Sequence, residues 1–211
     1  MSDVMKMAGH IGLASTIVLS PLSAVASDLS QQLSVVFDRS KPERTRITAA
    51  KSVAKSGARE AVIPLVQALQ NTKGSLKAAI RKALEDLEAT KVLLEDLGHE
   101  DPAVRKRGAE LLGVWQDPAS LPKLVAHLED PQAAVREASA TAIARFGGKD
   151  QVEALAKALR SDEVSDVRMA AAQALGQIDA PAAKAALTAA LATEKDEYVL
   201  VFINMGLKGK K

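Results

Sequence analysis

The chain has 211 residues, of which 47% are hydrophobic and only 2% aromatic, and its 28 Lys and Arg against 26 Asp and Glu give a net charge of +2. This balance excludes the strong basic excess of a dedicated nucleic-acid-binding protein. Cysteine is absent, which excludes disulfides, thiolate metal ligands and a cysteine nucleophile. The apolar residues are mostly Ala, Leu and Val, which favour closely packed helices, so we expect an all-α protein.

The N-terminal segment, residues 1–26, has the pattern of a secretory signal peptide. Lys6 precedes an apolar run that is too short to span a bilayer, and the segment ends in the sequence "AVA", a small-x-small cleavage pattern. We expect cleavage after Ala26 and a periplasmic or secreted protein with no membrane span. The start is either Met1 or Met5, and an ordinary amphipathic first helix is the alternative interpretation of the segment.

After this segment we expect a lead-in helix over 27–39, a repeat region over 40–207 and a basic tail over 208–211. The repeat is marked by a basic residue, most often directly after Val, which recurs at intervals of 31, 28, 31 and 32 residues. One further interval of 31 residues leads to Val199, where the basic residue is missing. A fixed period of this length is typical of a solenoid. The recurring residues are Arg46, Lys77, Arg105, Arg136 and Arg168.

Each unit has the pattern of two amphipathic helices. After Val135, for example, the small pair Ser139-Ala140 and then Ile143 lie on one helical face, and Gly147-Gly148 end the helix. A second apolar stripe follows. One such helix pair cannot bury its stripe alone, whereas a stack of pairs can. We therefore predict an α-solenoid of five to six helix pairs, in which the bulky last unit around Tyr198 forms a C-terminal cap.

These segments resemble the HEAT repeat, in the short bacterial and archaeal form known from phycobilisome lyases. The sequences "DPAVRKRGAELLG", "DPQAAVREASATAIA" and "DVRMAAAQALG" carry the resemblance well, and "KGSLKAAIRKALEDL" and "ERTRITAAKSVAKSG" carry it weakly. The resemblance covers about residues 40–207 and implies a HEAT-like α-solenoid. It implies little about function, because the matching residues are structural.

The five recurring basic residues are interpreted as a structural ladder. Each lies next to a Val or similar residue and soon after an Asp or Glu in most units. The resemblance implies that such an arginine pairs with the acids and carbonyls of the turns and holds neighbouring units in register, and the fork of a guanidinium suits that role. The alternative is a row of cations that binds a phosphate chain.

The alternative to a binding function is an enzymatic one, because some proteins with HEAT-like folds are enzymes. Deoxyhypusine hydroxylase binds two irons through several His-Glu pairs, whereas after residue 26 this chain has one such pair, His99-Glu100, and His127 has no adjacent acid. A bilin lyase needs a pigment pocket, and the chain has one Trp, one Tyr and three Phe, widely spread. We expect no catalytic residue, no cofactor and no metal. A lyase-like or accessory factor for the modification of a partner protein is the alternative.

The partner surface is predicted on the variable positions of the Val-Arg helices, two and six residues after the Val, which line the concave face in HEAT solenoids. Trp115, the single indole, either packs between units or forms an exposed interaction anchor. We expect a monomeric, non-enzymatic scaffold or adaptor that binds another protein on this face and binds no nucleic acid. The predicted contact residues are Lys51, Lys82, Lys106, Glu110, Glu137, Thr141, Met169 and Gln173.

Overall fold

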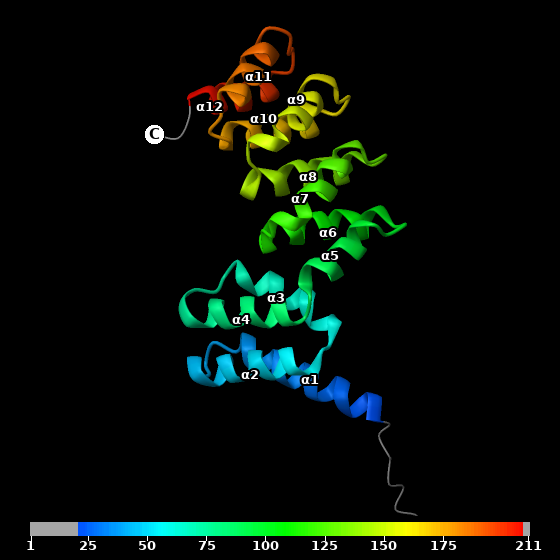
Figure 1. Ribbon diagram of the computed structural model, residues 1–211, viewed down its shortest axis with the longest axis vertical. Coiled ribbons are helices and arrows are strands. Elements are labelled where there is room, and N and C mark those ends of the chain that lie inside the picture. Colours follow the sequence, from blue (N-terminus) through cyan, green and yellow to red (C-terminus); the bar gives the residue numbers. More distant parts are fainter. Residues whose placement is uncertain (1–20, 209–211) are drawn as a thin grey trace, which may run out of the picture.

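In the computed structural model, residues 21–208 are described, with side chains from residue 27, and this part of the chain consists of helices and turns without a strand. Five helix pairs, from α2/α3 to α10/α11, form a stack between α1 at one end and α12 at the other (Figure 1). The predicted all-α solenoid is therefore confirmed. The helices are α1 Pro21–Phe37, α2 Glu43–Ser56, α3 Val62–Leu69, α4 Gly74–Asp86, α5 Ala89–Leu97, α6 Pro102–Trp115, α7 Leu121–Ala126, α8 Ala133–Phe146, α9 Val152–Ser161, α10 Ser165–Gln177, α11 Pro181–Leu191 and α12 Glu197–Lys208.

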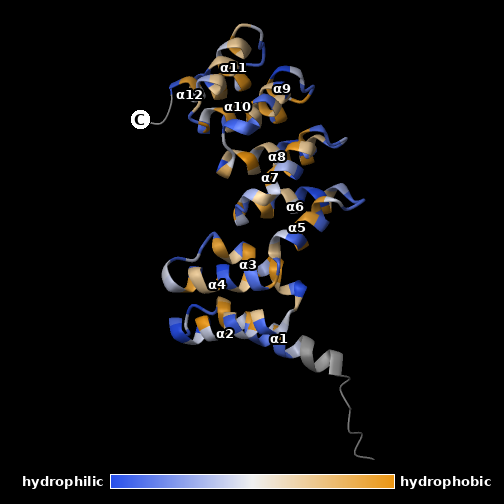
Figure 2. Ribbon diagram, viewed as in Figure 1, coloured by the Kyte–Doolittle hydropathy of each residue, from blue (hydrophilic) through white to orange (hydrophobic). Residues whose placement is uncertain are grey.

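The small residues of the repeat lie where helices approach most closely. Ser139, Ala140 and Ile143 of α8 are fully buried, in a core made mostly of Ala, Leu and Val (Figure 2). A Cβ on Gly176 of α10 would lie 2.6 Å from the Cα of Gly206 in α12, closer than real Cβ atoms approach another atom. Glycine is therefore required at this crossing for α12 to pack on α10.

The row of Val-Arg helices, which comprises α2, α4, α6, α8, α10 and α12, is interrupted between α4 and α6. Within the row, α2 packs on α4, and the four helices α6, α8, α10 and α12 pack on one another in turn. On the side away from α8, α6 packs on α5 and α3, and its contact with α4 is slight. Only Leu87 and Glu88 separate α4 from α5, and Glu88 has a φ of 52°. This tight turn coincides with the short repeat interval of 28 residues between Lys77 and Arg105.

Trp115, at the end of α6, packs at this interrupted junction. Its side chain is buried, and its Nε1–H donates a hydrogen bond of 2.8 Å to Thr90 Oγ1 on α5. The guanidinium of Arg81 on α4 lies 4.7 Å from the centroid of the indole, a cation–π distance, and donates to the Trp115 carbonyl. Of the two interpretations of Trp115, packing between units is the one that the structure shows.

The predicted N-terminal segments are only partly described. The predicted signal peptide falls mainly on residues 1–20, which lie outside the described residues, as do residues 209–211 of the predicted basic tail. The predicted lead-in helix over 27–39 falls largely within α1, which begins at Pro21. No helix between residues 21 and 208 combines the length and apolar character that a membrane span needs.

Candidate functional site

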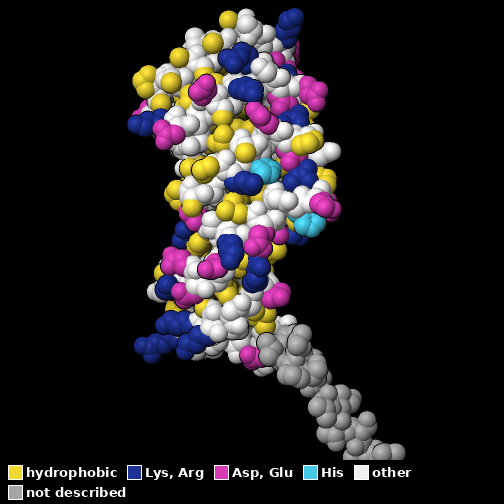
Figure 3. Space-filling model, turned by 45° about the vertical axis from the view of Figure 1, so that its right-hand side comes forward, with side chains coloured by type: hydrophobic (Ala, Val, Ile, Leu, Met, Phe, Trp, Pro, Cys, Tyr) yellow, Lys and Arg dark blue, Asp and Glu magenta, His cyan; other side chains and the backbone are white. Residues whose placement is uncertain are grey.

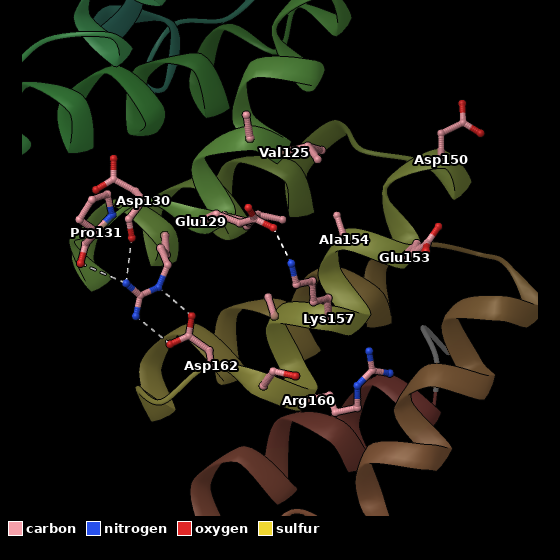
Figure 4. A pocket seen from close by; sticks show the side chains of 15 residues that line it. Val125, Glu129, Asp130, Pro131, Asp150, Glu153, Ala154, Lys157, Arg160 and Asp162 are labelled. Atoms are coloured by element: carbon pink, nitrogen blue, oxygen red, sulfur yellow. Dashed lines mark hydrogen bonds and ion pairs between the residues drawn. The ribbon is translucent and has the colours of Figure 1, made fainter.

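The repeat arginine of α8 connects two successive turns of the solenoid. Arg136 Nε lies 2.7 Å from Asp162 Oδ2, and its Nη2 donates to Asp162 Oδ1 at 2.9 Å. Its Nη1 donates to the carbonyl oxygens of Asp130, at 2.9 Å, and of Pro131. The side chains of Arg136 and Asp162 are 10% and 6% exposed. In Figure 4, dashed lines mark these contacts between Asp162 on one side and Asp130 and Pro131 on the other.

The same contact recurs one unit earlier and one unit later. Arg105 of α6 pairs with Asp130 at 2.7 and 2.9 Å, and Arg168 of α10 pairs with Glu194 at 2.8 and 3.2 Å. Each also donates to the carbonyls of the turn before its own helix. Asp130 and Asp162 therefore accept from one arginine through the carboxylate and from the next through the carbonyl. The turns between residues 99 and 194 form one continuous ladder.

The other two predicted ladder residues differ. Arg46 Nε donates to the Val36 carbonyl at the end of α1 and reaches no carboxylate. Lys77 is exposed and makes no side-chain hydrogen bond or ion pair within the described part of the chain. The guanidinium ladder thus begins only after the interruption between α4 and α6. The C-terminal units are connected by arginine–carboxylate pairs, which Arg46 and Lys77 do not form with the described residues.

The electrostatics of the ladder keep its members charged. Burial of the Asp162 carboxylate raises its pKa. The hydrogen bonds from Arg136 and from the Val164 N–H together lower the pKa by more than burial raises it, so the pKa lies below its ordinary value. The same balance holds for Asp130 and for Glu194. We call Asp130, Asp162 and Glu194 the ladder carboxylates. The hydrogen bonds to Asp162 raise the pKa of Arg136.

A polar groove lies over the Val-Arg helices α6, α8 and α10. It consists of two adjoining hollows of about 340 and 490 Å³, which share Thr141 and Arg145 of α8. The first hollow lies between α6 and α8 and the second reaches α10. Five of the eight residues predicted as partner contacts line this groove: Lys106, Glu110, Glu137, Thr141 and Gln173.

The remaining predicted contact residues lie elsewhere. Lys51 of α2 is exposed and lines neither hollow of the groove. Lys82 of α4 is also exposed and pairs with Asp86 of its own helix at 2.8 Å. Met169 of α10 is partly buried and packs against the core. The interruption between α4 and α6 therefore separates the two lysines from the groove.

The groove also contains residues that sequence reasoning missed. Val114, Arg145 and Gln177 line it from α6, α8 and α10, and each stands ten positions after the Val that opens its helix pattern. Positions two, six and ten after the Val form one stripe along a helix, because four residues exceed one turn by only a small angle. Extending the predicted stripe by one more turn would have found all three.

The polar side chains of the groove are largely free to bind another molecule. Within residues 27–208, the side chains of Glu137, Thr141, Arg145, Gln173 and Gln177 make no hydrogen bond or ion pair with other side chains or the backbone. The aliphatic part of Arg145 lies near Gly113, where a Cβ would be in ordinary contact with Arg145 Cδ at 3.5 Å; the closer neighbour of Gly113 is Ala142, whose Cα would lie 3.0 Å from that Cβ. The groove thus presents a guanidinium that has no ion-pair partner among the described residues, together with amide, hydroxyl and carboxylate groups.

A larger hollow of about 810 Å³ lies between α7 and α9, on the side of the second helices (Figure 4). Half of its charged side chains pair with each other, since Lys157 pairs with Glu129 at 2.6 Å and Arg136 pairs with Asp162. On the face of the molecule seen in Figure 3, side chains of both signs are interspersed along the middle and upper part of the stack, and dark-blue Lys and Arg side chains gather only at its lower left. We therefore regard the polar groove as the better candidate site.

The two histidines of the described residues, His99 and His127, do not form a metal centre. His99 is exposed, and its Nδ1 accepts a hydrogen bond of 3.0 Å from the Asp101 N–H; His127 Nδ1 lies 2.9 Å from the Lys123 carbonyl. Across the described residues, no three His, Asp or Glu side chains lie close enough together to hold a metal ion. The described residues thus do not fit a two-iron centre.

Comparisons with known proteins identify relatives that are similar in sequence. The chain is 33% identical over 123 residues to a HEAT repeat-containing taxis protein of Halobacterium salinarum, covering 58% of this chain and 28% of that protein. It is 30% identical over 125 residues to deoxyhypusine hydroxylase of Mus musculus, covering 57% of this chain and 41% of the enzyme. The chain therefore spans less than half the length of either relative.

Among solved structures, human deoxyhypusine hydroxylase in complex with glycerol is similar in fold, with a TM-score of 0.50 and 22% identity over 87% of this chain and 73% of that one. The family model for HEAT repeats matches residues 90–173 and 128–201, which together cover more than half of the chain and contain the whole arginine ladder. The chain belongs to the HEAT-repeat family.

Proposed function

We propose that the protein is a non-enzymatic scaffold or adaptor that binds a partner protein in the polar groove over α6, α8 and α10. One observation carries the proposal: the groove collects polar side chains that have no partner among the described residues, on helices that the ladder holds in register. A stack that is already ordered needs little further ordering on binding, which favours affinity. HEAT repeats in general mediate interactions between proteins.

The chemistry of the groove indicates which part of a partner it accepts. Arg145 supplies a planar set of donors that suits a carboxylate, and Gln173 and Gln177 can each both donate to and accept from a peptide backbone. The groove lacks a deep apolar cavity, so a partner segment that is polar and carries an acidic side chain fits it best. We further propose that this binding takes place outside the cytoplasm, on the basis of the signal-peptide pattern in residues 1–26.

The experiment compares two variants of equal charge change in co-purification from the native host. Lys106→Glu with Arg145→Glu changes the groove, and Lys51→Glu with Lys82→Glu changes exposed lysines beyond the interruption. The groove variant should lose the partner that co-purifies with the unaltered chain, and the second variant should retain it. Both should keep the melting temperature, since none of the four side chains is buried. A partner that survives the groove variant would overturn the proposed site, and a partner that is chemically modified in its presence would favour the lyase-like alternative.

A further inference from the structure

The outer face of α12 is apolar and uncovered. Val199 and Ile203 point inward and are fully buried, whereas Tyr198, Val201 and Met205 are 75%, 54% and 61% exposed. These three side chains form one stripe, because they are spaced by three and four residues on a helix. Figure 1 shows α12 beside α10 and α11 in the last part of the stack, and these two helices are its main neighbours.

This stripe differs from the outer face of a solenoid cap. A capping unit presents polar residues to water, which keeps the end of the stack soluble. The expected C-terminal cap does cover α10, through the close contact between Gly176 and Gly206. The outer face of α12, however, is apolar, like the faces that interior helices bury against their neighbours. A surface of this kind on an otherwise charged molecule marks an interaction site.

The stripe is complementary to a second copy of itself. In an antiparallel pair of α12 helices centred on residue 203, Val201 of one copy lies opposite Met205 of the other, and Tyr198 lies opposite Lys208. Lys208 of one copy then also lies about one residue, or roughly 1.5 Å along the axis, from the level of Glu197 in the other. At each end of the pair, the Lys208 ammonium of one copy thus lies near the Glu197 carboxylate of the other. The antiparallel helix dipoles favour the same orientation.

We propose that two copies of this chain associate through the exposed stripe of α12 as an antiparallel, two-fold symmetric dimer. The contact is independent of the polar groove, which lies on α6, α8 and α10, so both surfaces can be occupied together. Few residues take part compared with the 20–30 a side of a standard interface, so the dimer should dissociate on dilution, with a dissociation constant on the order of micromolar. This differs from the monomer expected from the sequence.

Sedimentation of the 211-residue chain over a range of concentrations tests the association. The unaltered chain should shift from monomer to dimer as its concentration rises, and Met205→Glu should raise the dissociation constant at least tenfold, because it buries a carboxylate in the contact. Ala185→Glu adds the same charge to an exposed position of α11 and should leave the dissociation constant unchanged. A chain that stays monomeric up to about 100 μM, or a dimer that Met205→Glu does not weaken, would overturn the proposal.

Disulfide crosslinking tests the orientation, since the natural chain has no cysteine. A mixture of Val201→Cys chains and size-tagged Met205→Cys chains should give a mixed disulfide dimer, because these positions lie opposite each other. Tyr198→Cys alone should give none, because its two copies would be about 15 Å apart along the axis, beyond the reach of a disulfide. Efficient crosslinking of Tyr198→Cys with itself, or none between the first pair, would rule out the antiparallel dimer.

Discussion

Replacing Arg136 by Met should destabilise the fold by about 3 kcal/mol, because it breaks a buried ion pair and leaves its partner charged. The substitution keeps an apolar stem of similar length and removes four hydrogen bonds, two to Asp162 and two to turn carbonyls. The Asp162 carboxylate is then left with the Val164 N–H as its remaining donor. We take the lower end of the range for broken buried pairs, because Asp162 borders an open hollow that water can enter.

Urea denaturation followed by circular dichroism at neutral pH measures this loss. With a denaturant dependence of about 2 kcal/mol per molar urea, the midpoint should fall by about 1.5 M. Lys157→Met is the matched control, since its pair with Glu129 has a similar 2.6 Å contact but two exposed side chains, and the midpoint should hardly change. Asp162→Ala should be as harmful as Arg136→Met, and the double variant should cost less than the sum. Equal midpoints for Arg136→Met and Lys157→Met would refute the structural role of the ladder.

Three further changes follow from the same contacts. The ladder carboxylates have lowered pKa values in the folded chain, so the free energy of unfolding should be constant above about pH 5 and fall as the pH drops below about 4; equal urea midpoints at pH 6 and pH 3 would contradict this. Gly176→Ala should cost roughly 1–3 kcal/mol by forcing α10 and α12 apart, whereas Gly148→Ala, with open space around its Cβ, should be nearly neutral in the same titration. Ser139→Ala should stabilise the chain by about 1 kcal/mol, because the buried Ser139 hydroxyl has no hydrogen-bond partner among residues 27–208; a lower melting temperature would argue against it.

The helical repeat could be predicted from the sequence because its signal is local. Each small residue of the pattern, such as Ala140 or Ala172, lies on a helix face that must pack tightly, and period and burial agree at these positions. The interruption after α4 depends on how a tight turn at Glu88 reorients α5, and this orientation is not encoded in periodicity. The short repeat interval of 28 residues indicates where along the chain the repeat changes, but not how α5 and α6 are oriented there.

The candidate site was predicted in part for the same reason. Position six after the Val identified Thr141 and Gln173, because helical spacing alone places this position on the face of the groove. Arg145 was missed since it lies beyond that window, and its availability depends on its forming no ion pair among the described residues, which is a property of the assembled stack. Lys51 was included because the stripe was extended through a row of helices that the structure shows to be interrupted.

Site-specific photo-crosslinking in the native host tests the central claim most directly. A photoreactive residue replaces Gln173 in the groove or, as the control, Lys184, which is exposed on α11. We predict that the Gln173 position crosslinks one protein, that the Arg145→Glu change abolishes this product, and that the Lys184 position does not give it. The same product from both positions, or from Gln173 regardless of Arg145, would show that the groove is not the binding site.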